Sequence, residues 1–189
     1  MKELLNEIRS CTVCSSFFDY EPRPIVQASA SSRIVIIGQA PGRKVHASGV
    51  PWDDASGKNL RSWLGVSDET FYNERDIALI PMGFCYPGSG KSGDLPPRPE
   101  CAPLWHDRLL SKCKSAQLTL LIGQYAQKYY LEDKIQSNLT ETVKSFQNYL
   151  PSYFPLPHPS PRNRIWMKKN SWFEEMVLPE LKTMVAEVL

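Results

Sequence analysis

The segment that decides the fold lies at residues 33–42, which read Arg-Ile-Val-Ile-Ile-Gly-Gln-Ala-Pro-Gly. Four successive β-branched residues closed by a glycine are typical of a strand that is buried on both faces. Similar apolar runs occupy residues 76–82 and 117–123, and a weaker run occupies residues 152–156. We therefore expect four strands.

Helical patterns separate these runs and continue beyond them. They lie at residues 2–10, 57–65, 68–74, 99–113, 124–131, 138–149 and 170–187. Strands that alternate with helices indicate a three-layer α/β/α fold, in which helices cover both faces of a central, mostly parallel four-stranded sheet. We see no repeat and no linker, so we expect a single domain over residues 1–189.

The composition is that of an ordinary globular protein. The chain has 189 residues, of which 42% are hydrophobic, and this is enough for one domain with a sizeable core. No run approaches the roughly 20 apolar residues that a membrane helix needs, and the first residues lack the features of a secretory signal. We expect a cytoplasmic monomer. The net charge of +2 neither indicates nor excludes a nucleic-acid partner.

The loops after the strands are the expected place for a site, because ligands bind at the carboxyl ends of parallel strands. The first loop, residues 39–56, begins with a stiff turn whose backbone N–H groups suit a carbonyl or carboxylate. It then carries His46, Trp52, Asp53 and Asp54. The alternative interpretation is an ordinary strand-to-helix loop, in which the tryptophan belongs to the core and an aspartate caps the next helix.

A second unusual segment follows the last expected strand and reads Pro157-His158-Pro159-Ser160-Pro161-Arg162-Asn163. Prolines on both sides of His158 restrict the backbone, and such rigidity suits an imidazole that donates a hydrogen bond to a developing anion. Basic residues then crowd a stretch without acids, namely Arg162, Arg164, Lys168 and Lys169. A solvated face is the alternative explanation for this cluster.

The five cysteines indicate metal or redox chemistry, because disulfides are rare in the cytosol. Cys11 and Cys14 form a C-x-x-C pair, and Cys85 and Cys101 flank a proline-rich loop. Four thiolates suit either a [4Fe–4S] cluster or zinc. We interpret Cys113, on an expected helix, as a buried small hydrophobe.

Two of these motifs together resemble the paired signature of uracil-DNA glycosylases. The turn at residues 38–42 resembles the Gly-Glu-Ala-Pro-Gly loop of the family 4 iron–sulfur type, and residues 158–160 resemble its His-Pro-Ser element. Gly49-Val50-Pro51-Trp52 resembles the family's Gly-x-Pro-Phe element, and residues 121–126 resemble its third strand. The resemblance implies a DNA-repair enzyme that flips uracil, or a related deaminated base, out of DNA and hydrolyses its N-glycosidic bond.

The resemblance also implies roles for individual residues. His158 is expected to stabilise the departing base, and Asp53 or His46 to activate water. The implied substrate-binding residues are Gln39, Ala40, Pro41, Gly42, Trp52 and Ser160. The implied DNA-binding residues are Arg162, Asn163 and Arg164. The implied ligands of a structural [4Fe–4S] cluster, with zinc as the alternative, are Cys11, Cys14, Cys85 and Cys101.

Several positions depart from the family pattern and indicate a divergent subfamily. Gln39 replaces the acid of the first motif, and Trp52 replaces the phenylalanine that stacks on the base. Residues 81–84 lack the asparagine that reads the uracil edge, and Arg162 stands where related enzymes often carry an apolar wedge. Two alternatives therefore stay open: a non-catalytic binder of damaged or single-stranded DNA, and a glycosylase for hypoxanthine or mismatched bases.

A run at residues 88–92, Gly-Ser-Gly-Lys-Ser, resembles part of a phosphate-binding loop. The complete pattern needs a glycine at Cys85 and a helix after Ser92, where the sequence Gly-Asp-Leu-Pro-Pro disfavours one. We therefore do not expect a nucleotide-phosphate site there.

Overall fold

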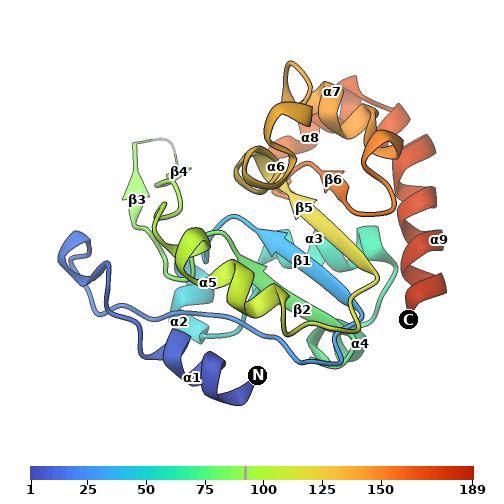
Figure 1. Cartoon of the computed structure of the whole chain (residues 1–189). Coiled ribbons are helices and arrows are strands. Elements are labelled where there is room, and N and C mark those ends of the chain that lie inside the picture. Colours follow the sequence, from blue (N-terminus) through green and yellow to red (C-terminus); the bar gives the residue numbers. More distant parts are fainter. Residues whose placement is uncertain (92) are drawn as a thin grey trace.

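The computed structural model describes residues 1–91 and 93–189, so Ser92 of the rejected phosphate-loop run lies outside the described residues. Its centre is a four-stranded sheet of order β2-β1-β5-β6, and every neighbouring pair is parallel (Figure 1). The strands are β1 (Ile34–Gly38), β2 (Ile77–Pro81), β5 (Leu118–Ile122) and β6 (Phe154–Leu156). The expected fold class and the four expected strands are confirmed.

Helices surround the sheet, and a small antiparallel hairpin projects beside it. The helices are α1 (Lys2–Arg9), α2 (Arg43–Ser48), α3 (Ala55–Leu64), α4 (Asp68–Tyr72), α5 (Cys101–Leu110), α6 (Gly123–Leu131), α7 (Leu139–Lys144), α8 (Arg164–Lys169) and α9 (Leu178–Val188). Short 3₁₀ or π turns occupy Ser15–Phe17, Glu132–Lys134, Phe146–Tyr149, Pro161–Asn163 and Phe173–Val177. The hairpin consists of β3 (Ser89–Gly90) and β4 (Gly93–Asp94).

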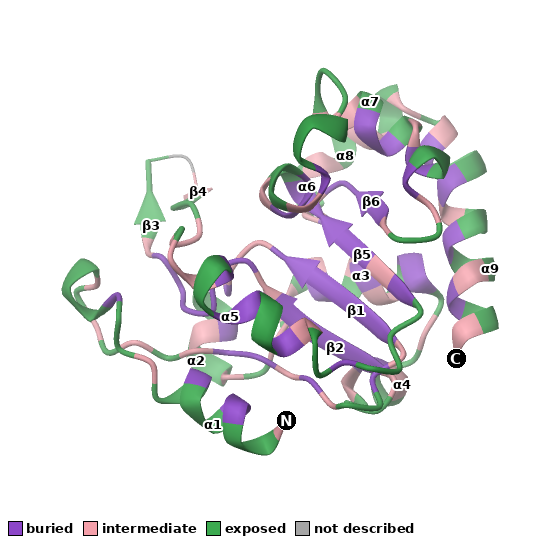
Figure 2. Ribbon diagram, viewed as in Figure 1, coloured by how far each residue is buried: buried purple, intermediate pink, exposed green. Residues whose placement is uncertain are grey.

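Both faces of the sheet are buried, which explains why its strands are unbroken apolar runs. Val35 and Ile37 of β1 pack into a core shared with α1, α5 and α6. Ile34 and Ile36, which point the other way, pack into a second core shared with α3, α4, α7 and α9. Figure 2 shows the central strands as largely buried. Of their residues, only Pro81 and Thr119 have intermediate exposure. The result is the three-layer arrangement.

Helix α2 was not expected from the sequence, because six residues are too few to show a helical period. A distant side chain completes its C-terminus: Nη1 of Arg23 donates hydrogen bonds to the carbonyl oxygens of His46 and Ala47, at 2.7 and 2.9 Å. Gly49 then ends the helix with a φ of 75°, which a glycine adopts without strain. Long-range contacts therefore make this helix.

The strand order places a pocket at one edge of the sheet. The chain passes from β1 to β2 on one side and then crosses to β5 on the other side. At such a switch point the loops leave in opposite directions and open a crevice outside the carboxyl ends of the strands. No helix in residues 1–91 and 93–189 is long and apolar enough to cross a membrane.

Candidate active site

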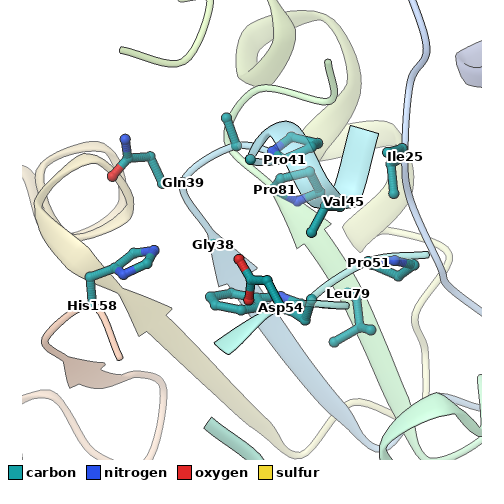
Figure 3. Close-up of a pocket in the computed structure, with 13 residues that line it drawn as sticks. Ile25, Gly38, Gln39, Pro41, Val45, Pro51, Asp54, Leu79, Pro81 and His158 are labelled. Atoms are coloured by element: carbon teal, nitrogen blue, oxygen red, sulfur yellow. The ribbon is translucent and has the colours of Figure 1, made fainter. Parts of the chain in front are cut away.

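A narrow cavity of about 50 Å³ opens at this edge of the sheet (Figure 3). Its lining includes the turn Gly38–Gly42, Trp52, Asp54 and His158, with Ile25, Val45, Pro51, Leu79 and Pro81. A wider recess of about 330 Å³ adjoins it, shares Gln39–Gly42, Asp54 and His158, and adds Ser160 and Arg162. The structure therefore brings the expected substrate-binding residues and the expected catalytic histidine to one site.

Trp52 forms part of the wall of the cavity in a strained backbone conformation. Its φ is 59°, in the left-handed region that few large residues adopt. Two glycines make room for it: a Cβ at Gly38 would lie 2.8 Å from Cζ2 of Trp52, and a Cβ at Gly57 would lie 1.8 Å from its carbonyl oxygen. The indole lies 5.8 Å from the imidazole of His158, with an angle of 31° between the rings.

Two asparagines fix the backbone beside His158. Nδ2 of Asn163 donates a hydrogen bond to the carbonyl oxygen of His158 at 2.7 Å. Nδ2 of Asn59, on α3, donates to the carbonyl oxygen of Pro159 at 2.9 Å. Asn163 was expected to bind DNA; in the structure its amide holds the histidine loop. The sequence did not single out Asn59, because only the fold brings α3 to this loop.

The environment of His158 keeps its ring neutral at pH 7. Burial lowers the pKa of His158, and the negative charge of Asp54 raises it in part. The net direction is downward from the usual value near 6.5. A neutral imidazole carries one N–H, so it can donate one hydrogen bond without bringing a positive charge to the site.

The carboxylate at the pocket is Asp54 and not the expected Asp53. Asp54 lines both the cavity and the recess, and its Oδ1 accepts a hydrogen bond from the backbone N–H of Gly57 at 2.8 Å, which caps α3. Asp53 is exposed and lines neither. It lies near Tyr72, whose pKa is raised chiefly by burial and further by the Asp53 charge.

His46, the other expected catalytic group, also lies away from the cavity. Its ring is 5.1 Å from that of Tyr20 and 5.7 Å from that of Tyr86. Burial, and then the charge of Arg23, lowers the pKa of His46. Among the residues that the structure describes, its buried Nδ1 atom has no hydrogen-bond partner. The geometry favours a packing role for this side chain.

The basic residues after the histidine loop divide between two surfaces. Arg162 lines the recess, and one of its nitrogens lies 3.2 Å from where a Cβ of Gly93 would stand. Arg164 lines a separate groove. The chain also presents apolar surface here, because Ile165, the residue after Arg164, is 70% exposed.

The strand end after β2 contributes little polar surface. Pro81 lines the cavity, and Met82 is buried in the core with α1 and α5. No asparagine side chain therefore reaches the cavity from this strand end, as the sequence indicated.

The four expected metal ligands come together at a different place. Cys11, Cys14, Cys85 and Cys101 line a small cavity of about 20 Å³ beside α5. Burial, with a further contribution from the neighbouring thiols, raises the pKa of Cys85 to about 12 and that of Cys101 to about 11. Cys113 lies in the core instead, as expected.

The four thiols share this cavity without converging on a single point. Within residues 1–91 and 93–189, no three His, Cys, Asp or Glu side chains are close enough to hold one metal ion. All five cysteines of the chain are present as thiols.

The fold and the pocket define an α/β protein with a cavity at the switch point of a parallel sheet. The model of the Uracil DNA glycosylase superfamily matches residues 26–182, and the chain belongs to that superfamily. Among solved structures, the chain is similar to a Methanosarcina acetivorans protein provisionally named a uracil DNA glycosylase. The two are 17% identical over 84% of this chain and 98% of that one, with a TM-score of 0.43.

Proposed function

We propose that this protein is a DNA-repair glycosylase that hydrolyses the N-glycosidic bond of uracil, or of a related deaminated base, after the base is flipped out of DNA. One observation carries the proposal: in a chain of this superfamily, His158 and Asp54 line the same narrow cavity from different loops. A base inside a duplex is out of reach of such a cavity, so flipping must come first, at a cost of a few kcal/mol.

The cavity supplies the groups that a flipped base requires. The Trp52 indole offers a flat apolar surface for stacking. The Gln39 side chain, which lines both the cavity and the recess, offers a carboxamide for the polar edge of the base. In Figure 3, Gln39 and His158 lie on the same side of the cavity, with Asp54 across from them. Gln39 thus recognises the polar edge of the base, a role that an asparagine has in the resembled family.

Bond cleavage needs stabilisation of two opposite charges. The C1′–N bond breaks, its electron pair leaves with the base, and the sugar becomes positive. His158 donates its N–H to the base oxygen that becomes anionic, and this bond is stronger in the transition state than in the ground state. Asp54 stabilises the sugar cation and takes a proton from the water whose oxygen bonds to C1′.

The residues around the cavity also suit DNA. Ser160 and Arg162 line the recess, where they can bind phosphates next to the flipped nucleotide. The exposed Ile165 side chain can occupy the space that the base leaves in the stack. A glycosylase for hypoxanthine or a mismatched base is a second candidate, because the strand end at Pro81 and Met82 offers no asparagine to select uracil.

We further propose that Cys11, Cys14, Cys85 and Cys101 hold a structural [4Fe–4S] cluster. Four thiols that line one cavity suit an all-thiolate site, and the resemblance to the family 4 iron–sulfur type favours a [4Fe–4S] cluster over zinc. A cluster there would tie the segment after α1 to the start of α5. The hydrolysis itself needs no electron transfer.

The test of the function is single-turnover base release from oligonucleotides that contain uracil, hypoxanthine or a G·T mismatch, each as single strand and duplex. We expect fastest release from uracil, and no release from the matched undamaged strand. Release from hypoxanthine or the mismatch alone would favour the second candidate. DNA binding without base release from any substrate would favour the alternative of a non-catalytic binder of damaged or single-stranded DNA.

A further inference from the structure

A surface groove of about 700 Å³ lies between α3 and the segment that follows the histidine loop. Lys58 of α3 lines one wall, and Arg164 and Lys168 of α8 line the other, with Trp63 of α3 at the bottom. Glu174 lines it as well. We call this the α3–α8 groove.

The charge of the α3–α8 groove is predominantly positive. Lys58, Arg164 and Lys168 are exposed and face it, against the single acid Glu174. Trp63 is 7% exposed and gives the groove an apolar floor. Basic walls above an apolar floor are complementary to a sugar–phosphate backbone, which carries charge on its phosphates and apolar surface on its sugars.

The groove is continuous with the candidate active site. Ser160 lines both the groove and the recess beside the cavity. Asn59 lines the groove and also donates the hydrogen bond that fixes Pro159, so one wall of the groove and the His158 loop are tied together. A strand whose flipped nucleotide enters the cavity can therefore continue into the groove.

We propose that the α3–α8 groove binds the phosphate backbone of the substrate strand on one side of the flipped nucleotide. The inference rests on the proposed function, because it takes DNA as the partner. It adds Lys58 of α3 to the basic residues that the sequence associates with DNA. It also assigns different roles to two adjacent lysines, because Lys168 lines the groove and Lys169 does not.

Adjacent residues of equal charge provide matched variants for the test. Binding is measured by fluorescence anisotropy with an oligonucleotide that carries a central tetrahydrofuran abasic analogue, which the enzyme cannot hydrolyse. At about 0.15 M salt the screening length is about 8 Å, so charges outside the groove contribute little. Lys168→Gln should weaken binding about 3- to 10-fold and lower the salt slope by about one, and Lys58→Gln should do the same. Lys169→Gln should change neither.

The acidic pair should respond in the opposite direction. Glu174→Gln removes the negative charge that faces the groove and should tighten binding, whereas Glu175→Gln, which alters a neighbour outside the groove, should not. All these side chains are exposed, so the melting temperature serves as the control for folding.

Shortening the oligonucleotide tests which flank lies in the groove. Removal of the flank that lies in the groove should reduce the affinity of wild type more than that of Lys168→Gln, because the variant has already lost a contact to this flank. Removal of the other flank should reduce both affinities equally. The groove assignment would be overturned if Lys168→Gln and Lys169→Gln lost equal DNA affinity. It would also be overturned if the effect of Lys168→Gln were the same whichever flank is removed.

The same measurements separate the groove from the proposed activity. If removal of only one flank distinguishes wild type from Lys168→Gln, and wild type releases no base, the groove proposal stands and the glycosylase proposal is rejected. Normal base release with no difference between Lys168→Gln and Lys169→Gln would reject the groove and retain the glycosylase. Absence of DNA binding by wild type would reject both.

Discussion

The carboxylate of Asp54 and the imidazole of His158 face the same cavity from opposite sides, and the charge of Asp54 acts on the pKa of His158 (Figure 3). Burial lowers the pKa of His158, and the Asp54 charge limits that lowering. The ring stays neutral and the carboxylate stays available near it. One group is then suited to an anion that forms on the base, and the other to a cation that forms on the sugar.

Removal of the imidazole should slow the chemical step. A donor that acts mainly in the transition state typically contributes about 100- to 1,000-fold in rate. His158→Ala should therefore reduce single-turnover release of uracil by that order, while affinity for DNA and the melting temperature change little. His46→Gln is the matched control, because His46 lies outside the cavity. Equal rates for wild type and His158→Ala would remove His158 from the mechanism.

The two adjacent aspartates should differ sharply. Asp54→Asn retains an acceptor for Gly57, since asparagine caps helices as well as aspartate does, but removes the charge from the cavity. Base release should fall about 100-fold or more, as for loss of a general base. Asp53→Asn should release base at nearly the wild-type rate. The reverse order would place the catalytic carboxylate at Asp53.

The pH dependence of base release should reflect the lowered pKa of His158. Neutral imidazole is the active form, so activity is lost as pH falls through that pKa. Because the pKa lies below its usual 6.5, the decline of the rate on the acid side should have its midpoint below pH 6.5. Asp54→Asn removes the charge that raises this pKa and should move the midpoint to still lower pH. A wild-type midpoint above pH 6.5 would contradict the assignment.

Asn163 should influence catalysis without contacting phosphates. Its amide holds the carbonyl oxygen of His158, so Asn163→Ala should slow base release while the salt slope of DNA binding stays unchanged. Arg164→Gln, at the next residue, whose side chain lines the groove, should instead lower the salt slope by about one. A lowered slope for Asn163→Ala would return this residue to the DNA-binding group.

Oxygen-free purification should yield a brown protein that absorbs near ~400 nm, as iron–sulfur proteins do. Cys85→Ser should lose iron and solubility, because the cluster would join distant segments. Cys113→Ser is the matched control: this buried cysteine lies outside the four-thiol cavity, so iron should be retained. Stoichiometric zinc without iron in the wild-type preparation would refute the cluster.

The sheet could be predicted because burial on both faces leaves a continuous apolar run for each strand. The short helix α2 could not, since the guanidinium that caps it comes from Arg23 in another segment. The predicted helix at residues 138–149 is also shorter in the structure, where α7 ends at Lys144 and a 3₁₀ turn follows. Local patterns do not contain such tertiary contacts.

The sequence predicted which loops form the candidate site. It did not predict which of two adjacent residues in a loop faces the cavity. Which of Asp53 and Asp54 faces the cavity depends on the backbone at Trp52, whose φ of 59° requires the space beside Gly38 and Gly57. His46 was expected in the catalytic site, but its ring packs against Tyr20 and Tyr86, which are far away from it in sequence.

The two glycines around Trp52, at positions 38 and 57, should differ in how readily they are substituted in the superfamily. At position 38 the three atoms nearest to a Cβ all belong to the indole ring, so a larger residue can arise there once position 52 carries a smaller side chain. At position 57 a Cβ would meet the main-chain carbonyl of residue 52, which no change of side chain removes. Sequence change at position 38 should therefore covary with position 52, whereas glycine at position 57 should persist wherever this turn is inherited.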